Sequence, residues 1–390
     1  MKEKFLLGLK LLLIVLLVVV GSIISVKVWS GKEEKLEDVT EIVIEKNMTI
    51  AQIGKVNKLS NIVLKNAFQL HSKEDLQKKF SETGLSIEDA KKKIVKSFAL
   101  PSEEASKNWK KIAIKFVLWI AFLVFIFTLI RKNKIKTKLR NRLYFISFVL
   151  FGIVLGADPS PMGTIKDNIS LLGSYHVIFP PRVVALFVML LMVVLANKFI
   201  CSWGCQFGTL QDFIFRMNRK NKKPIIKQIK LPFVMTNAIR ILFFVIFTFI
   251  AILWAFDIIA PIDPFKIFKP ATLGIIGIIF VAIMLSVSLI IYRPWCHLFC
   301  PFGLIGWIAE KISIIKIKVD YDKCIACGNC MKSCPSTAME AIIKHKKTIP
   351  DCFSCATCIE SCPVDAISFK GGKRNKPSNE FIRKLNKNLK

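Results

Sequence analysis

The sequence CIACGNCMKSCP at residues 324–335 recurs with the same spacing as CFSCATCIESCP at residues 352–363. Each copy holds three cysteines separated by two residues, a fourth cysteine after three more residues, and then a proline. Cysteines at two-residue gaps can wrap one face of a four-iron cluster, whereas the fourth ligand must come from elsewhere in the chain. In two-cluster proteins with this spacing, the last cysteine of each run ligates the other cluster.

The two runs therefore predict a ferredoxin-like α+β domain with two [4Fe–4S] clusters over residues 314–370. A structural zinc site is the alternative, but zinc takes four ligands in two separated pairs, which does not explain two runs of four. The first cluster is expected on Cys324, Cys327, Cys330 and Cys362. The second cluster is expected on Cys334, Cys352, Cys355 and Cys358.

The composition indicates a membrane protein. The chain has 390 residues, of which 53% are hydrophobic, and this is too apolar for an ordinary soluble protein. The net charge of +31 is concentrated in short runs beside apolar segments, which is how membrane topology is encoded, so nucleic acid is not an expected partner. The 12 cysteines fall into two groups of four and two pairs, a pattern typical of metal ligation in a reducing compartment.

Six segments are candidates for transmembrane helices, because a helix needs about 20 apolar residues to cross a bilayer. They are residues 5–28, 112–130, 143–158, 180–200, 232–256 and 273–292, and the third is short. The expected fold class is a mainly α membrane protein with about six transmembrane helices. The expected domains are an N-terminal anchor (1–30), a small external α(+β) domain (31–111), a transmembrane core (112–313), the ferredoxin-like domain (314–370) and a basic tail (371–390).

The charges of the loops predict the orientation. Residues 131–142 carry seven Lys or Arg and no acid, and residues 198–230 carry eight against one acid, whereas the loops at 158–182 and 257–272 are balanced. Cytoplasmic loops are enriched in basic residues. We therefore expect a multi-pass protein of the cytoplasmic membrane, with the ferredoxin-like domain and both termini in the cytoplasm and residues 31–111 outside it.

The external segment is expected to be a small helical domain that packs its own core. A strand is predicted at residues 38–45. Helix starts of the capping-box type are predicted at Thr49-x-x-Gln52, Ser72-x-x-Asp75 and Ser86-x-x-Asp89.

The other four cysteines form two similar pairs, in CSWGCQFG at residues 201–208 and CHLFCPFG at residues 296–303. Each pair follows a predicted span, so both are expected at the cytoplasmic boundary of the membrane. Their thiolates could hold a further iron–sulfur or metal centre, work as redox dithiols, or be buried apolar thiols. The residues concerned are Cys201, Cys205, Cys296 and Cys300.

With these motifs, residues 115–370 resemble the NapH/NosR/CcoG-type membrane polyferredoxins, and they are most similar to a NapH-like core. The resemblance implies quinol-linked electron transfer that supplies a periplasmic reductase or an assembly process. The chain departs from the pattern at Gln206, where the first pair lacks the usual Pro. The external segment lacks the Ser/Thr-Gly-Ala-Ser/Thr type of flavin site, so no covalent flavin is expected, and no β-sandwich follows residue 363.

The remaining polar residues indicate which further cofactors the sequence predicts. The four histidines form neither a Cys-x-x-Cys-His motif nor a pair within the spans, so no haem is expected. A quinone or proton site is predicted at Asp158, His176 and Asp263 near the outer face, although Asp-Pro pairs are also common turns. The basic tail is expected on anionic lipid, with an acidic protein partner as the alternative.

The expected function is iron–sulfur electron transfer that links a quinol pool or a cytosolic donor to a redox partner protein. One alternative is an assembly or maturation factor that reduces a metal or a disulfide of another protein. A membrane redox regulator is a second alternative. The sequence leaves open whether the chain acts as an enzyme, such as a quinol dehydrogenase.

Overall fold

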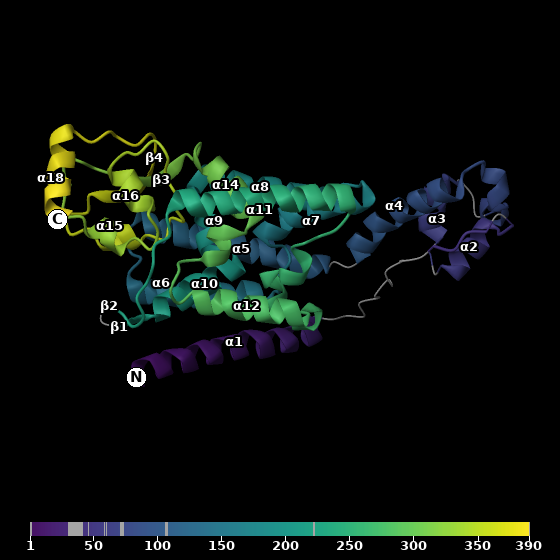
Figure 1. Cartoon of the computed structure of the whole chain (residues 1–390), viewed down its shortest axis with the longest axis horizontal. Helices are drawn as coiled ribbons and strands as arrows, with labels where there is room; N and C mark the ends of the chain where they lie inside the picture. Colours follow the sequence, from purple (N-terminus) through teal and green to yellow (C-terminus); the bar gives the residue numbers. More distant parts are fainter. Residues whose placement is uncertain are drawn as a thin grey trace.

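The computed structural model describes residues 2–29, 42–45, 47–57, 59, 61–70, 74–105, 108–220 and 223–389. A long helical bundle forms its centre, with a small helical unit at one end and the C-terminal domain at the other (Figure 1). The two ends of the bundle are called the ferredoxin end and the far end below.

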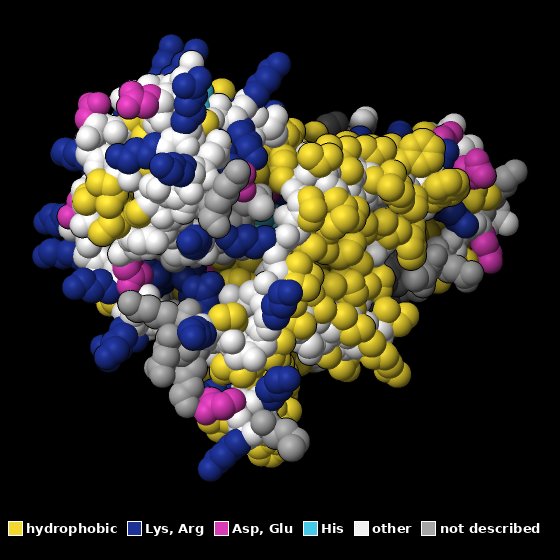
Figure 2. Space-filling model, turned by 60° about the vertical axis from the view of Figure 1, so that its left-hand side comes forward, with side chains coloured by type: hydrophobic (Ala, Val, Ile, Leu, Met, Phe, Trp, Pro, Cys, Tyr) yellow, Lys and Arg dark blue, Asp and Glu magenta, His cyan; other side chains and the backbone are white. Residues whose placement is uncertain are grey.

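Three helices in the described part of the chain are long and apolar enough to cross a membrane: α1 (Lys2–Trp29), α5 (Trp109–Arg131) and α11 (Phe233–Trp254). Two apolar helices are shorter, α8 (Pro180–Ala196) and α12 (Ile275–Val287). The segment predicted as the third span, residues 143–158, contains the second half of α6 (Thr137–Phe148) and then a π-helix, η3 (Val149–Val154). Helices able to cross a membrane by length and composition are thus present, and the count of six spans stays a prediction. Apolar side chains cover the face of the bundle that is seen in Figure 2.

The two segments between these helices that were predicted as loops are largely helical. Residues 158–182 contain α7 (Pro161–Tyr175), which begins where Ser160 accepts a hydrogen bond from the Gly163 N–H and Pro161 occupies the first turn. The first turns of α7 are buried in the bundle. At the far end, Lys166 forms ion pairs with Asp167, Asp257 and Asp263 and so joins α7 to the segment after α11. That segment consists of short 3-10 helices η4 (Ala260–Ile262), η5 (Pro264–Phe268) and η6 (Pro270–Thr272).

The C-terminal domain has the predicted α+β composition. Strands β3 (Ile315–Val319) and β4 (Ile367–Gly371) pair antiparallel, with Ile315 opposite Gly371. Between them lie the short helices α15 (Asn329–Ser333), α16 (Ala338–Ile343) and α17 (Thr357–Glu360). The Phe369 ring on β4 packs against Phe127 of α5 at 5.7 Å, which brings the domain onto the bundle.

The basic tail forms α18 (Asn379–Leu389), whose apolar side packs on the C-terminal domain. Leu385 is fully buried, and the Phe381 ring lies 5.0 Å from that of Tyr321. The Asn388 side chain donates a hydrogen bond to the Ala326 carbonyl. Helix α18 therefore lies at the end of the molecule remote from the bundle (Figure 1), not along the bundle surface as a lipid-bound tail would.

The N-terminal unit contains α2 (Ile50–Val56), α3 (Asn61–Phe68), the 3-10 turns η1 (Glu74–Gln77) and η2 (Phe80–Thr83), and α4 (Ile87–Ala105). It has its own hydrophobic core, separate from that of the bundle. Thr49 and Gln52 form the predicted capping box, and Ser86 accepts the predicted hydrogen bond from the Asp89 N–H. Residues 42–45 are not a strand, while residues 38–41 and Ser72 lie outside the described residues.

Candidate iron–sulfur site

The C-terminal domain brings its eight cysteines together in the two sets that their spacing predicts. The Cys330 thiol interacts electrostatically with the thiols of Cys324, Cys327 and Cys362. The Cys358 thiol interacts with those of Cys355, Cys334 and Cys352, and more weakly with Cys330 of the other set. The two sets are therefore neighbours, and their assignment as cluster ligands remains a prediction.

The two cysteine runs share one backbone geometry. Ala326 and Gly328 in the first run have φ values of 57° and 71°, and Ser354 and Ala356 at the same places in the second have 49° and 61°. These left-handed residues turn the backbone so that the Ala326 N–H donates to Cys324 and the Ser354 N–H donates to Cys352. Amide donors favour the thiolate form of cysteine, which is the form that binds iron.

Burial of these cysteines favours the protonated thiol over the thiolate. It raises the pKa of Cys330 to about 12, and the neighbouring thiols of Cys324 and Cys327 raise that pKa further. The protein alone therefore keeps this side chain protonated at neutral pH. Binding of iron must displace the proton, so cluster assembly releases protons and supplies part of the folding free energy.

The other two cysteine pairs lie on two helical hairpins. The first hairpin consists of α9 (Phe199–Trp203) and α10 (Gln206–Met217), and the second of α13 (Pro294–Leu298) and α14 (Pro301–Glu310). Each hairpin begins and ends near the ferredoxin end and makes its turn inside the bundle. At the turns, Gly204 lies against Trp119 near the middle of α5, and the Phe299 ring lies 5.2 Å from that of Phe243 near the middle of α11. The cysteine pairs thus lie near turns inside the bundle, and their position at the membrane boundary stays a prediction.

The two hairpins have equivalent contacts. Cys205 and Cys300 are the N-caps of α10 and α14, and their Sγ atoms accept hydrogen bonds of 3.4 Å from the Gly208 and Gly303 N–H groups. An arginine from elsewhere donates to the carbonyl of the first cysteine of each pair. Arg293 Nη1 lies 2.6 Å from the Cys201 oxygen, and Arg240 Nη1 lies 3.2 Å from the Cys296 oxygen. The sequence similarity of the pairs therefore reflects a structural repeat, despite Gln206 in place of Pro301.

The four hairpin thiols are neighbours in the folded chain, and a shared metal centre on them stays a prediction. They interact electrostatically with one another, yet among the described residues no three His, Cys, Asp or Glu side chains converge on one metal ion. A cubane cluster has four irons, each of which takes a thiolate at a different corner. The N-terminal dipoles of α10 and α14 favour negative charge at Cys205 and Cys300. The buried Trp119 Nε1–H, which has no partner among the described residues, lies against Gly204 beside them.

A buried ion cluster joins the second hairpin to the ferredoxin domain. Asp351, which directly precedes Cys352, forms ion pairs with Lys198 and, at 3.2 Å, with Arg240, and His297 Nδ1 lies 3.5 Å from the same carboxylate. Lys198, Arg240 and Asp351 are 1% exposed or less. Arg240, which belongs to the predicted span at residues 232–256, therefore pairs with the ferredoxin domain and does not reach toward water.

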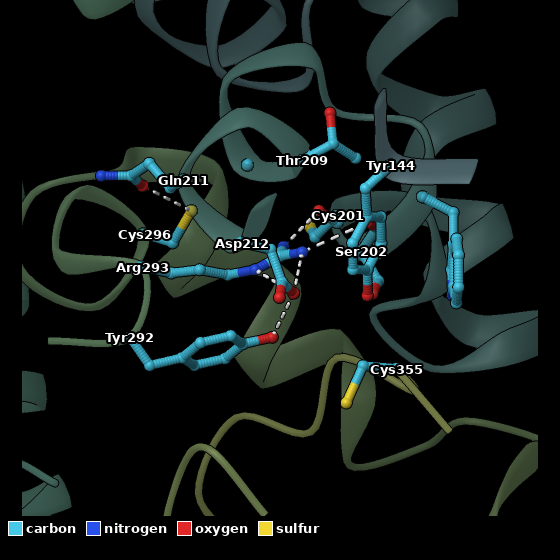
Figure 3. Close-up of polar contacts among 12 residues, drawn as sticks. Tyr144, Cys201, Ser202, Thr209, Gln211, Asp212, Tyr292, Arg293, Cys296 and Cys355 are labelled. Carbon is cyan, nitrogen blue, oxygen red and sulfur yellow. Dashed lines mark hydrogen bonds and ion pairs between the residues drawn. The ribbon is translucent and has the colours of Figure 1, made fainter. Parts of the chain in front are cut away.

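A second buried ion cluster lies between the hairpins and Cys355 (Figure 3). Asp212 of α10 accepts hydrogen bonds from Arg293 Nη2 at 2.7 Å and from the Tyr292 hydroxyl at 2.7 Å. Arg293 also donates to the Ser202 carbonyl at 3.2 Å. The cluster lies against the ferredoxin loop, since the Arg293 guanidinium is 4.8 Å from the centre of the Phe353 ring.

Sequence reasoning missed Asp351, Asp212, Lys198 and Arg293. One signal was present: a basic residue stands three positions before the first cysteine of each pair, Lys198 before Cys201 and Arg293 before Cys296. The acidic partners of these two basic residues could not be found in this way. Asp351 and Asp212 are far in sequence from Lys198 and Arg293, respectively, and neither belongs to a repeated motif.

The predicted quinone residues are not gathered in one site. Asp158 lines a small, mainly apolar cavity of about 90 Å³ at the far end, together with Trp109, Phe116 and Phe179. Asp263 is buried, pairs with Lys166 and caps η5. His176 is the left-handed C-cap of α7 and is exposed.

The cavity is connected to the first hairpin. Gln206, the residue after Cys205, donates from Nε2 to the Ala157 carbonyl at 3.2 Å, beside Asp158. Lys115 of α5 is fully buried and donates to the carbonyls of Gly156 and Asp158 at 2.7 and 3.1 Å. Of the three predicted residues, Asp158 lines this cavity, whereas Asp263 and His176 do not.

Comparison with known protein families supports iron–sulfur binding in two regions. A family described as a 4Fe-4S dicluster domain matches residues 317–369, which contain all eight cysteines of the ferredoxin domain. A family described as a 4Fe-4S binding domain matches residues 178–224 and again residues 273–319, each match containing one hairpin. The chain thus carries 4Fe–4S binding domains together with helices able to cross a membrane.

Three curated proteins are similar to the chain. "Putative electron transport protein YccM" of Escherichia coli K12 is 28% identical over 154 residues, which are 36% of this chain and 42% of that protein, so the chain spans less than half of its length. "Uncharacterized protein MJ0749" of Methanocaldococcus jannaschii is 27% identical over 57% of this chain and 80% of its own length. "Uncharacterized protein MJ0750" of the same organism is 24% identical over 52% and 83%. No solved structure matches the chain.

Proposed function

We propose that this protein carries electrons through a membrane, between a quinone site at the far end of the bundle and the two clusters of the ferredoxin domain. A third iron–sulfur cluster on Cys201, Cys205, Cys296 and Cys300 connects the two. The position of the hairpin turns carries the proposal, because they lie inside the bundle between the Asp158 cavity and the ferredoxin loop. A cluster of this kind carries one electron at a time. A quinol, which gives up two electrons on oxidation, would therefore pass them to the clusters in two successive steps.

Short contacts support the two connections along this route. On the far side, Gln206 links Cys205 to the backbone of the Asp158 cavity. On the ferredoxin side, Arg240 bridges the Cys296 carbonyl and Asp351, the neighbour of Cys352. The order from the far end is therefore cavity, hairpin cysteines, second ferredoxin set and first ferredoxin set.

The charges around the hairpin cysteines favour a reduced centre. Arg293 and Arg240 are fully or almost fully buried and donate to the carbonyls of Cys201 and Cys296. Two helix N-termini add partial positive charge. Positive charge and hydrogen bonds near a cluster stabilise the added electron and raise its reduction potential.

The similarity to YccM supports electron transport as the role, and the exposed ferredoxin domain is the surface for a redox partner protein. We place the ferredoxin end in the cytoplasm. The strongly basic segment between α5 and α6 lies at this end, since the Thr137 N–H donates to Glu360 of the ferredoxin domain.

The test is to purify the protein anaerobically and to compare it with a Cys201→Ser/Cys296→Ser variant. The protein should contain about 12 irons, four for each of three cubane clusters, and the variant about eight. A quinol analogue should reduce the ferredoxin clusters in the native protein and not in the variant, whereas dithionite should reduce them in both.

A Cys324→Ser/Cys327→Ser variant is the matched control, because it removes ferredoxin ligands and leaves the hairpins intact. It should lose iron from the ferredoxin domain only. Eight irons in the native protein, or quinol reduction that persists without the hairpin cysteines, would refute the route.

A further inference from the structure

A large basic cavity lies where the bundle meets the ferredoxin domain, and the proposed electron route does not use it. Its volume is about 1030 Å³. It lies between the ends of α6 and α10, the hairpin of β1 (Arg219–Lys220) and β2 (Lys223–Pro224), and helices α15 and α17. Six of its described lining residues are basic and one, Glu360, is acidic. The basic residues are Arg140, Arg216, Arg219, Lys227, Lys230 and Lys332.

The acidic groups nearby are already engaged. Glu360 is paired with Arg140 at 2.9 Å and accepts hydrogen bonds from Thr137. Asp212 is shared between Arg216 and Arg293. The positive charge of the cavity wall therefore exceeds the negative charge that the described residues supply.

Two buried arginines in the wall keep unused donors. Arg140 is fully buried and donates from Nε to the Cys355 carbonyl at 2.8 Å, and Arg216 is 7% exposed and pairs through Nε with Asp212. The Nη2 atom of each has no hydrogen-bond partner among the described residues. A buried guanidinium donor without a partner is costly, and both arginines belong to the wall of this positively charged cavity.

The pKa of a neighbouring side chain is consistent with the excess charge. Burial, and then the charge of Arg216, lowers the pKa of Arg219 from its usual value. An anion in the cavity would remove this repulsion.

We propose that this cavity binds a phosphate-bearing ligand. Arginine forks and lysine ammonium groups are the side chains that recognise phosphate oxygens. The cavity has the size of a small-molecule site, and Phe215, Pro224 and Ile229 give it an apolar wall. It also lies beside the ends of apolar helices, so the phosphate can belong to an anionic lipid headgroup or to a soluble compound.

A ligand here would act on the clusters through its charge. The lining includes Pro335, next to Cys334, and Ser361, next to Cys362, so the cavity reaches both ferredoxin sets. Negative charge beside a cluster disfavours the added electron. A bound phosphate should therefore shift the reduction potentials of these clusters to more negative values.

The proposal can be tested on the anaerobically purified full chain, with Lys227→Gln/Lys332→Gln compared with Lys347→Gln/Lys370→Gln. All four lysines are exposed, and only the first two line the cavity. One arm titrates pyrophosphate by calorimetry and follows the cluster potentials. In the other arm, the protein is reconstituted in nanodiscs of phosphatidylcholine with phosphatidylglycerol and is then extracted again in detergent. The phosphatidylglycerol that stays bound to the protein is measured.

Saturable pyrophosphate binding that weakens about tenfold in the cavity variant alone supports a soluble ligand, since one charged contact contributes roughly that factor. Phosphatidylglycerol retained by the native protein and the control, and lost from the cavity variant, supports a lipid headgroup. Absence of both, or equal losses in the two variants, overturns the proposal. The iron content of each variant, expected to match the native protein, separates this result from that of the electron route.

Discussion

Asp351 is the residue on which the junction between bundle and ferredoxin domain depends. Its carboxylate is 1% exposed and faces Lys198, Arg240 and His297, which come from three different helical segments. Burying these charged groups costs more free energy than burying apolar side chains of similar size. Removing one partner is nevertheless destabilising, because the other charges then stay buried without an opposite charge. The arrangement therefore fixes one position of the Cys352 loop against the hairpins.

Replacement of Asp351 by Asn should destabilise this junction by about 3–5 kcal/mol, because Lys198 and Arg240 would remain buried without a carboxylate. The measurement is thermal unfolding in detergent combined with limited proteolysis between the bundle and the ferredoxin domain. We expect a lower melting temperature and cleavage between residues 311 and 315.

Asp320→Asn is the matched control, since Asp320 belongs to the same domain and its side chain is 44% exposed. Its effect should stay within about 0.5 kcal/mol, as for most surface substitutions. Equal melting temperatures for the two variants would show that the buried ion cluster does not hold the junction.

At the scale of elements, the hairpins depend on a glycine that follows each N-cap cysteine by three residues. A Cβ atom on Gly303 would lie 2.6 Å from the Cys296 carbonyl oxygen, and one on Gly208 would lie 2.9 Å from that of Cys201. No rotamer change can relieve a clash with backbone. Each glycine thus permits the close turn that keeps both cysteines of a pair on one side.

The Gly303→Ala substitution should cost about 1–3 kcal/mol, because the second hairpin must open to accept the added carbon. The iron content should fall by about four per chain if that hairpin holds half of a cubane cluster. Iron analysis and thermal unfolding of the purified protein measure the two effects.

Gly274→Ala serves as the control, since a Cβ atom there meets nothing within 4 Å. It should keep both the native iron content and the native melting temperature. Normal iron content in Gly303→Ala would contradict the role of the close turn in cofactor binding.

On the scale of the whole molecule, charge is distributed along the long axis. Lys and Arg side chains gather on the ferredoxin end, whereas the sides of the bundle are apolar (Figure 2). Three of the basic residues counted for topology are buried in ion pairs and do not contribute to this surface, namely Arg140, Lys198 and Arg216. The segment after α5 still supplies enough positive charge to indicate the cytoplasmic side.

Reporter fusions test this orientation. A fluorescent protein fused after residue 390 should be fluorescent, and alkaline phosphatase fused after Ala105 should be active, because the proposed orientation puts the first site in the cytoplasm and the second outside it. Exchanging the two reporters provides the internal control. Active phosphatase at the C-terminus would show that the chain has the opposite orientation in the membrane to the one proposed.

The sequence by itself determined the features that repeat or that depend on local pattern. The two cysteine runs predicted the iron–sulfur domain between residues 314 and 370, and the family match at 317–369 supports iron–sulfur binding there. Long apolar segments predicted α1, α5 and α11, because hydrophobic length alone makes a helix able to cross a membrane. The echo between the two shorter cysteine motifs indicated related elements, and their backbone contacts are equivalent.

The tertiary structure alone decided where those elements lie. The local sequence does not show that residues 199–217 and 294–310 turn back into the bundle. Short apolar helices have the same pattern of apolar residues in a surface loop and in a buried hairpin. The pairs Asp351–Arg240 and Asp212–Arg293 join residues more than 75 positions apart in the sequence, and the basic cavity is assembled from five separate segments. Contacts between distant residues depend on packing of the whole chain, and this is why the depth of the hairpin cysteines, the buried ion clusters and the basic cavity could be seen only in the folded molecule.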